Sequence, residues 1–82
     1  MNVERIVKEI RAVFESEVRL QEINYYVDDR LQKVLEIFIE ADAVKKEEFE
    51  KLNNVLFEYD LKIIEFGVNC YEDSLYIYLI EK

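Results

Sequence analysis

This chain of 82 residues has no histidine, no tryptophan and no proline, and it has a single glycine and a single cysteine, Gly67 and Cys70. Histidine and cysteine are leading general bases, nucleophiles and metal ligands in enzymes, so their scarcity removes much of what catalysis uses. We therefore expect a protein without enzymatic activity, without a cofactor and without a bound metal. The nineteen acids against eleven bases predict instead a function in binding.

Cys70 has no second cysteine with which to form an intramolecular disulfide, which is typical of a reducing compartment. The longest uninterrupted apolar stretch is the six residues from Leu75 to Ile80, too short for a signal peptide or a membrane span. We expect a cytoplasmic protein with one domain over residues 1–82. A chain of this length buries only about 60–65% of the surface that its unfolded form exposes, so a homodimer is a natural way to gain stability.

The net charge of −8 opposes direct binding to nucleic acid, whose phosphates are neutralised by lysine and arginine. Residues 1–46 contain ten acids and eight bases, whereas residues 47–82 contain nine acids and three bases. Because most of the negative charge lies in the second half, we expect that half to contact a protein partner with a basic surface.

The spacing of apolar residues predicts two amphipathic helices. Residues 3–14 have apolar side chains at the helical period, Asn2 is a suitable N-cap, and the helix should end near Ser16. The same period over residues 43–59 predicts a second helix with Asp42 as its N-cap. Its outer face should contain Lys45, Lys46, Glu47, Glu50, Lys51, Asn54 and Glu58.

Alternating apolar and polar residues predict four strands, over residues 20–28, 31–40, 64–70 and 75–80. The order is αββαββ, two helix-plus-hairpin units. Two helices that cover one face of a four-stranded antiparallel sheet bury both apolar helix stripes. The expected fold is therefore an α+β two-layer sandwich.

The last strand is apolar or aromatic on both faces, and Tyr76, Tyr78 and Ile80 lie on the face that the helices should leave open. Tyr25 or Tyr26, together with Tyr71, is expected to join them. We predict a homodimer through this face or through the strand edge beside it, and packing within one chain is the alternative. Stacking on RNA bases is disfavoured because the neighbouring residues are acidic.

Several acids are candidates for a site. We expect partner contacts from residues on the second helix and in the last hairpin turn, namely Glu47, Glu50, Glu58, Glu72 and Asp73. Glu47, Glu48 and Glu50 are otherwise interpreted as a solvated helix face. A metal-dependent enzyme built on Asp28, Asp29, Glu72 and Asp73 is a rival hypothesis, and solvated hairpin turns explain the same two pairs. Alternation places Cys70 inward with Phe66 and Val68, which predicts a buried, unreactive thiol.

Three segments together resemble a known family. They are the stretch from Phe14 to Asp28, the stretch from Lys46 to Leu52 and the stretch from Tyr71 to Leu79. They are similar to the small acidic anti-CRISPR proteins of archaeal rudiviruses that inhibit type I-D systems. The resemblance implies a non-enzymatic viral inhibitor, an α/β dimer that binds the large subunit of a host interference complex. It carries no individual functional residue over to this chain. A small structural or assembly protein that acts as a homodimer is the alternative.

Overall fold

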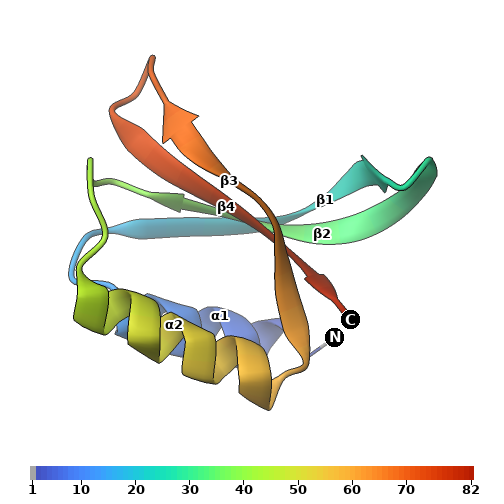
Figure 1. The fold of residues 1–82 in the computed structure, drawn as a ribbon, viewed down its shortest axis with the longest axis horizontal. Coiled ribbons are helices and arrows are strands. Elements are labelled where there is room, and N and C mark those ends of the chain that lie inside the picture. The colour runs from blue at the N-terminus through green and yellow to red at the C-terminus, as the bar shows by residue number, and fades with distance from the viewer. Residues whose placement is uncertain (1) are drawn as a thin grey trace.

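The computed structural model describes residues 2–82 and confirms the α+β fold with the order αββαββ (Figure 1). Two helices lie on one face of a four-stranded antiparallel sheet. Neither helix in this part of the chain is long and apolar enough to cross a membrane. The elements are α1 (Val3–Val13), β1 (Val18–Val27), β2 (Arg30–Ile39), α2 (Lys46–Glu58), β3 (Leu61–Asn69) and β4 (Ser74–Glu81).

The strand order in the sheet is β1-β2-β4-β3, so β2 and β4 are central and β1 and β3 are the edges. Leu35 of β2 pairs with Leu79 of β4, and Ile39 pairs with Leu75. The β3–β4 turn therefore lies at the end of the sheet where β1 begins and β2 ends. The β1–β2 turn lies at the opposite end, and Figure 1 shows the two hairpins pointing in different directions.

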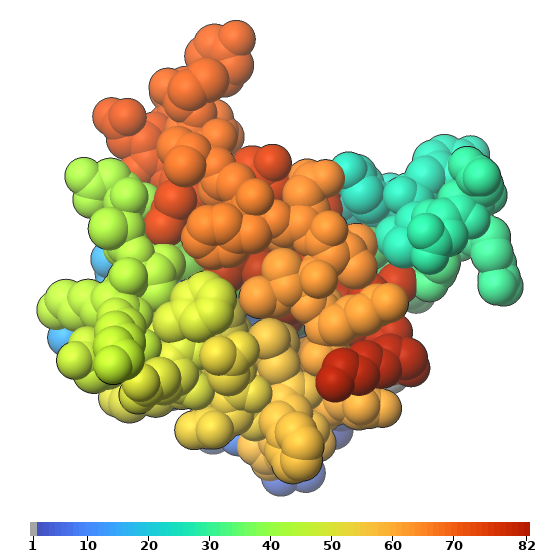
Figure 2. All heavy atoms as spheres, in the orientation of Figure 1, coloured from blue at the N-terminus to red at the C-terminus, as the bar shows by residue number. Residues whose placement is uncertain are grey.

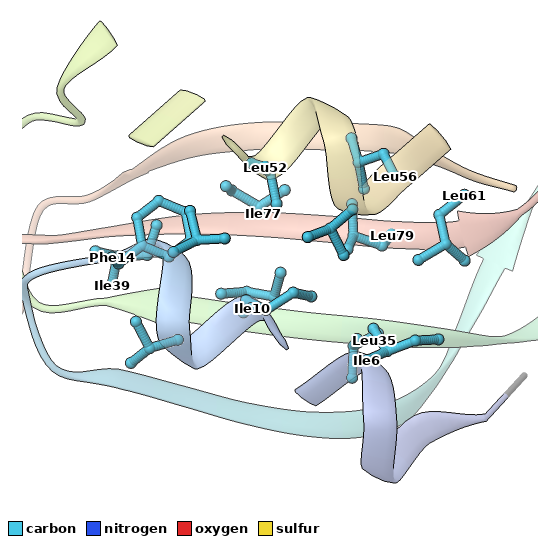
Figure 3. Packing of buried hydrophobic residues seen from close by; sticks show 14 of the residues in the cluster. Ile6, Ile10, Phe14, Leu35, Ile39, Leu52, Leu56, Leu61, Ile77 and Leu79 are labelled. Carbon is cyan, nitrogen blue, oxygen red and sulfur yellow. The ribbon is translucent and has the colours of Figure 1, made fainter. Parts of the chain in front are cut away.

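The core lies between the helices and the sheet. Alternate residues of β2 and β4 point towards the helices, and Ile37 and Ile77 are fully buried there. Each helix contributes apolar side chains from one stripe, among them Ile6 and Ile10 of α1 and Leu52 of α2 (Figure 3). This burial is the main source of stability, because removing apolar surface from water is worth about 25 cal/mol per Å².

Helix α1 has the predicted N-cap, since the side chain of Asn2 accepts a hydrogen bond from the backbone N–H of Arg5 at 3.4 Å. The helix ends at Val13, earlier than the expected Ser16. Phe14 is already extended, and its side chain is buried in the core. The helix therefore ends where the ring of Phe14 turns into the core, before Glu15 and Ser16.

Helix α2 begins at Lys46, so the predicted N-cap at Asp42 is wrong. The acceptor for the first turn comes instead from Glu48, whose Oε1 accepts a hydrogen bond from the N–H of Lys45 at 2.9 Å. Its Oε2 accepts another from the N–H of Glu15, at 2.8 Å, in the connection between α1 and β1. Glu48 is thus a buried structural residue, which corrects its interpretation as part of a solvated face.

Among residues 2–82, positive φ angles occur at four residues, all aspartates: Asp28, Asp29, Asp60 and Asp73. Such positions usually favour glycine, but the only glycine of the chain does not have a positive φ. Aspartate tolerates this conformation better than most residues because its short side chain hydrogen-bonds to nearby backbone. The turns of this protein therefore depend on aspartate where other chains use glycine.

Cys70 is exposed in the turn after β3, so the prediction of a buried thiol is wrong. Phe66 pairs with Ile77 and Val68 with Leu75, which places both on the helix side of the sheet as predicted. They are nevertheless 47% and 65% exposed. The reason is that β3 is an edge strand and its hairpin extends past the helices (Figure 1).

Replacing Glu48 with glutamine should lower the free energy of unfolding at neutral pH by about 1.5–3 kcal/mol, the value of hydrogen bonds to a charged group. The N–H groups of Lys45 and Glu15 hold the pKa of Glu48 below its usual value of 4.5. Stability from a lowered carboxyl pKa is present above the ordinary pKa and is lost as the pH falls through the lowered one. The difference between the two proteins in urea unfolding should therefore shrink in acid. Glu47→Gln, at the exposed neighbouring position, should change little, and an equal loss in both variants would contradict this role.

Asp60 follows the C-cap of α2 with a φ of 56°, a position where helices usually have glycine. Asp60→Gly should raise the melting temperature by a few degrees, since about 0.5–1 kcal/mol of backbone strain is removed. Asp60→Ala should lower it, because alanine keeps the strain and loses the polar side chain. Calorimetry on both variants checks the sign, and equal shifts would show that φ is not the cause.

Candidate functional site

Acidic side chains gather at the end of the sheet that contains the β3–β4 turn. Two chain connections meet this turn, one between α1 and β1 and the other between β2 and α2. Together they present six exposed carboxylates, which we call the acidic end: Glu15, Glu17, Glu40, Asp42, Glu72 and Asp73.

Backbone and side-chain contacts hold these connections side by side. The N–H of Glu40 donates to the carbonyl of Glu17 at 2.9 Å. Arg19 forms an ion pair with Glu72 at 3.0 Å and approaches Glu40 at 3.9 Å. Lys45 forms an ion pair with Glu15. Arg11 lines a shallow hollow beside Glu15 and Glu17, and Lys46 follows Lys45, so four bases lie near the six acids and the acidic end keeps a negative excess.

The structure separates the residues that the sequence predicts as partner contacts. Glu72 and Asp73 belong to the acidic end, and Glu47 lies beside it in the first turn of α2. Glu50 lies about one turn further along the helix. Glu58 is in the last turn, about 17 Å from Glu47 along the helix axis. All five are exposed, but they do not form one surface.

The two acidic turns are at opposite ends of the sheet. Asp28 and Asp29 connect β1 to β2. The ten-residue length of the paired strands, about 30 Å, separates this turn from the end of the sheet near Glu72 and Asp73. Within residues 2–82, no three His, Cys, Asp or Glu side chains are placed to hold a metal ion. The rival hypothesis of an enzyme built on these four acids therefore has no common site.

The sheet face away from the helices, here called the open face, is covered by tyrosines. Tyr76 and Tyr78 project from β4, and their ring centroids are 5.3 Å apart. Tyr25 of edge strand β1 reaches across β2 and packs edge-on against Tyr78, with centroids 5.1 Å apart. The predicted Tyr25 is thus part of this cluster, whereas Tyr26 and Tyr71 are exposed elsewhere.

Two carboxylates complete the cluster. The hydroxyl of Tyr25 donates to Oε1 of Glu65 at 3.0 Å, and Gln21 donates to the buried Glu36. The bond to Glu65 raises the pKa of Tyr25, and burial together with a bond to Glu36 raises the pKa of Tyr78. Both phenols therefore stay protonated near neutral pH and act as hydrogen-bond donors rather than as bases.

The tyrosines create a second, small apolar layer on the open face. Val34 and Ile80 lie on this face, yet they are only 0% and 6% exposed. Tyr25 of β1 reaches Tyr78 of β4 and Glu65 of β3 across the same face, so side chains from three strands gather on it. Packing within one chain, the alternative to a dimer, is thus present at Tyr76, Tyr78 and Ile80. The homodimer itself stays a prediction.

Gly67 has a packing role in this cluster. It pairs directly with Tyr76 across β3 and β4. A Cβ atom at this position would lie 2.5–2.7 Å from the hydroxyl and ring atoms of Tyr76. The single glycine of the chain therefore provides space for an aromatic ring, and the ring in turn covers the edge strand.

No family model, no curated protein and no solved structure matches this chain. The acidic end was missed from the sequence because charge was compared between halves of the chain, whereas the fold joins acids from both halves. The sequence did contain a signal for the acidic end, in the positions of its acids relative to the predicted helices and strands. Glu15, Glu17, Glu40 and Asp42 all lie where predicted elements begin or end, and antiparallel pairing brings such positions to common ends of a sheet.

Proposed function

We propose that this protein is a non-enzymatic binding module that presents its acidic end to a basic surface of a protein partner. The observation that carries the proposal is the convergence of six exposed carboxylates from three separate connections at one end of the sheet. Complementary charge of this kind speeds association and selects basic partners. A net charge of −8 also disfavours direct binding to nucleic acid.

The biological setting that we propose follows from the sequence resemblance alone. Basic protein surfaces commonly hold nucleic acid, and an acidic protein that covers such a surface competes with that nucleic acid. In this setting the protein acts as a viral inhibitor of the anti-CRISPR kind, which blocks a basic surface of a host nucleic-acid-processing complex. It would then work in the cytoplasm of the infected cell.

Charge reversal tests the acidic end. The partner is first captured from cells that carry a CRISPR system, identified by mass spectrometry and purified. We expect Glu17→Lys with Asp42→Lys to slow its association by about tenfold at low salt, because steering by a charged surface raises on-rates by ten- to a thousandfold. The effect should be smaller at physiological salt, where the Debye length is about 8 Å. Surface plasmon resonance measures both rates.

The matched control places the same change of charge elsewhere. Glu50→Lys with Glu58→Lys alters the net charge equally, but on the middle and last turns of α2. It should slow association less than the acidic-end variant does. Equal slowing by both variants would mean that total charge, and not the acidic end, directs binding.

The alternative function is that of a small assembly protein acting as a homodimer. The observation that favours it is the open face, where Tyr76 and Tyr78 are only half-buried, so a second copy can cover their rings. Such a dimer predicts that Tyr78→Asp converts a species of twice 10.0 kDa into a monomer in sedimentation velocity. A lower melting temperature without a change in mass would assign Tyr78 to packing within one chain.

A further inference from the structure

The two edges of the sheet differ in how they are protected against pairing with another chain. Edge strands usually contain charged or polar residues that discourage such pairing. Strand β1 follows this rule over most of its length, with exposed Arg19, Gln21, Glu22 and Asn24, and its exposed aromatic side chain, Tyr26, lies next to the hairpin turn. Strand β3 does not follow it, because the exposed side chains in its second half are Phe66 and Val68.

Helix α2 extends the apolar character of this edge. Phe49 and Phe57 are eight residues apart, so they lie on one stripe of the helix, and Phe57 is 85% exposed. Helix α2 packs against β3, and Figure 2 shows the atoms of both elements in contact on one face of the molecule. Phe57 lies in the last turn of α2, next to the start of β3, whereas Phe49 lies in the first turn, so an added strand beside the second half of β3 would have Phe66 and the first turn of α2 on its helix-facing side.

The other side of such a strand would meet a different environment. Glu65 and Gly67 of β3 pair with Tyr78 and Tyr76, so they belong to the open face. The carboxylate of Glu65 and the ring of Tyr76, which lies against Gly67, flank the edge there. A carboxylate next to an aromatic ring suits a lysine or arginine side chain, through ion pairing and cation–π attraction.

A β-bulge limits the part of β3 that can pair with an added strand. A β-bulge between Ile63 and Glu65 interrupts the register with β4. The regular stretch beyond it runs from Glu65 to Asn69, which is enough for a short added strand. Successive side chains point to opposite faces, so Phe66 and Val68 lie on the helix side of this stretch, and Glu65, Gly67 and Asn69 lie on the open face.

We infer that the free edge of β3 accepts an extended segment of a basic protein partner, in which apolar residues alternate with lysine or arginine. The apolar residues face Phe66, Val68 and α2, and the basic residues face Glu65 and Tyr76. This inference rests on the proposed function, for which it supplies a mode of binding. Main-chain pairing gives such complexes affinity, and the alternating side chains give them specificity.

The negative charge around β3 favours a basic segment over a second copy of this chain as the occupant of the edge. Residues 60–73, which contain β3, have four acids, Asp60, Glu65, Glu72 and Asp73, against a single base, Lys62, and Arg19 of β1 pairs with Glu72. A second copy would bring the same excess and a further net charge of −8 to this edge. A lysine-containing strand is attracted by the same charges.

A synthetic peptide of about eight residues that alternates lysine and valine tests the inference with the purified protein. We expect backbone amide shifts in nuclear magnetic resonance spectra to concentrate in Glu65–Asn69 and the exposed stripe of α2. A peptide of identical composition with its lysines in one block should bind at least about tenfold more weakly, equivalent to 1.4 kcal/mol. Equal affinity, or shifts confined to the acidic end, would overturn strand addition while leaving the proposed function standing.

Variants on the two edges provide the matched comparison. Val68→Lys should reduce affinity for the alternating peptide at least about tenfold, since it places a charge in the apolar row. Asn24→Lys, at an exposed position of β1, adds the same charge and should have a much smaller effect. Unchanged affinity in the folded Val68→Lys protein would overturn the inference. So would a dimer of the parent protein that Val68→Lys dissociates in sedimentation velocity, because the occupant would then be a second copy.

Discussion

The carboxylate of Glu48 joins two parts of the chain that are 33 residues apart in sequence. One oxygen accepts from the backbone at the start of α2, and the other accepts from the backbone of the connection that follows α1. A buried carboxylate is costly unless it is hydrogen-bonded, and these two bonds offset that cost. The connections on either side of Glu48 therefore have fixed positions, and the exposed acids that they contain gather at one end of the sheet as a result.

Two sets of carboxylates consequently have different roles. Glu36 and Glu48 are buried and accept hydrogen bonds from their own chain. The carboxylates of the acidic end are exposed and are only partly balanced by bases. A net charge of −8 is thus divided between groups that hold the structure together and groups that remain available to a partner.

Periodicity was sufficient to predict the fold class and the order of the elements. Both helices and all four strands lie within a few residues of their predicted positions, because each has one buried face. The start of α2 was not predictable in this way, since its acceptor, Glu48, is inside the helix and its second donor, Glu15, is distant in sequence. The exposure of Cys70 was not predictable either, because alternation indicates a face of the sheet and not how far the helices cover it.

The candidate sites, too, could be predicted only in part from the sequence. Tyr76 and Tyr78 were correctly placed on the open face, but the contacts of Tyr25 with Tyr78 and Glu65 join β1 to β4 and β3. The acidic end depends on strand order, which places the β3–β4 turn beside the connections of the first half. Both are properties of long-range pairing, which the local pattern of a single sequence does not contain.

The exposed thiol of Cys70 has a practical consequence. It is the only cysteine of the chain, and it lies in the turn that also contains Glu72 and Asp73. A fluorophore or spin label attached through maleimide chemistry would therefore modify one position only, at the border of the acidic end and of the free edge of β3. Without any engineered residue, the protein has a reporter position where local changes in polarity or mobility can be followed in real time.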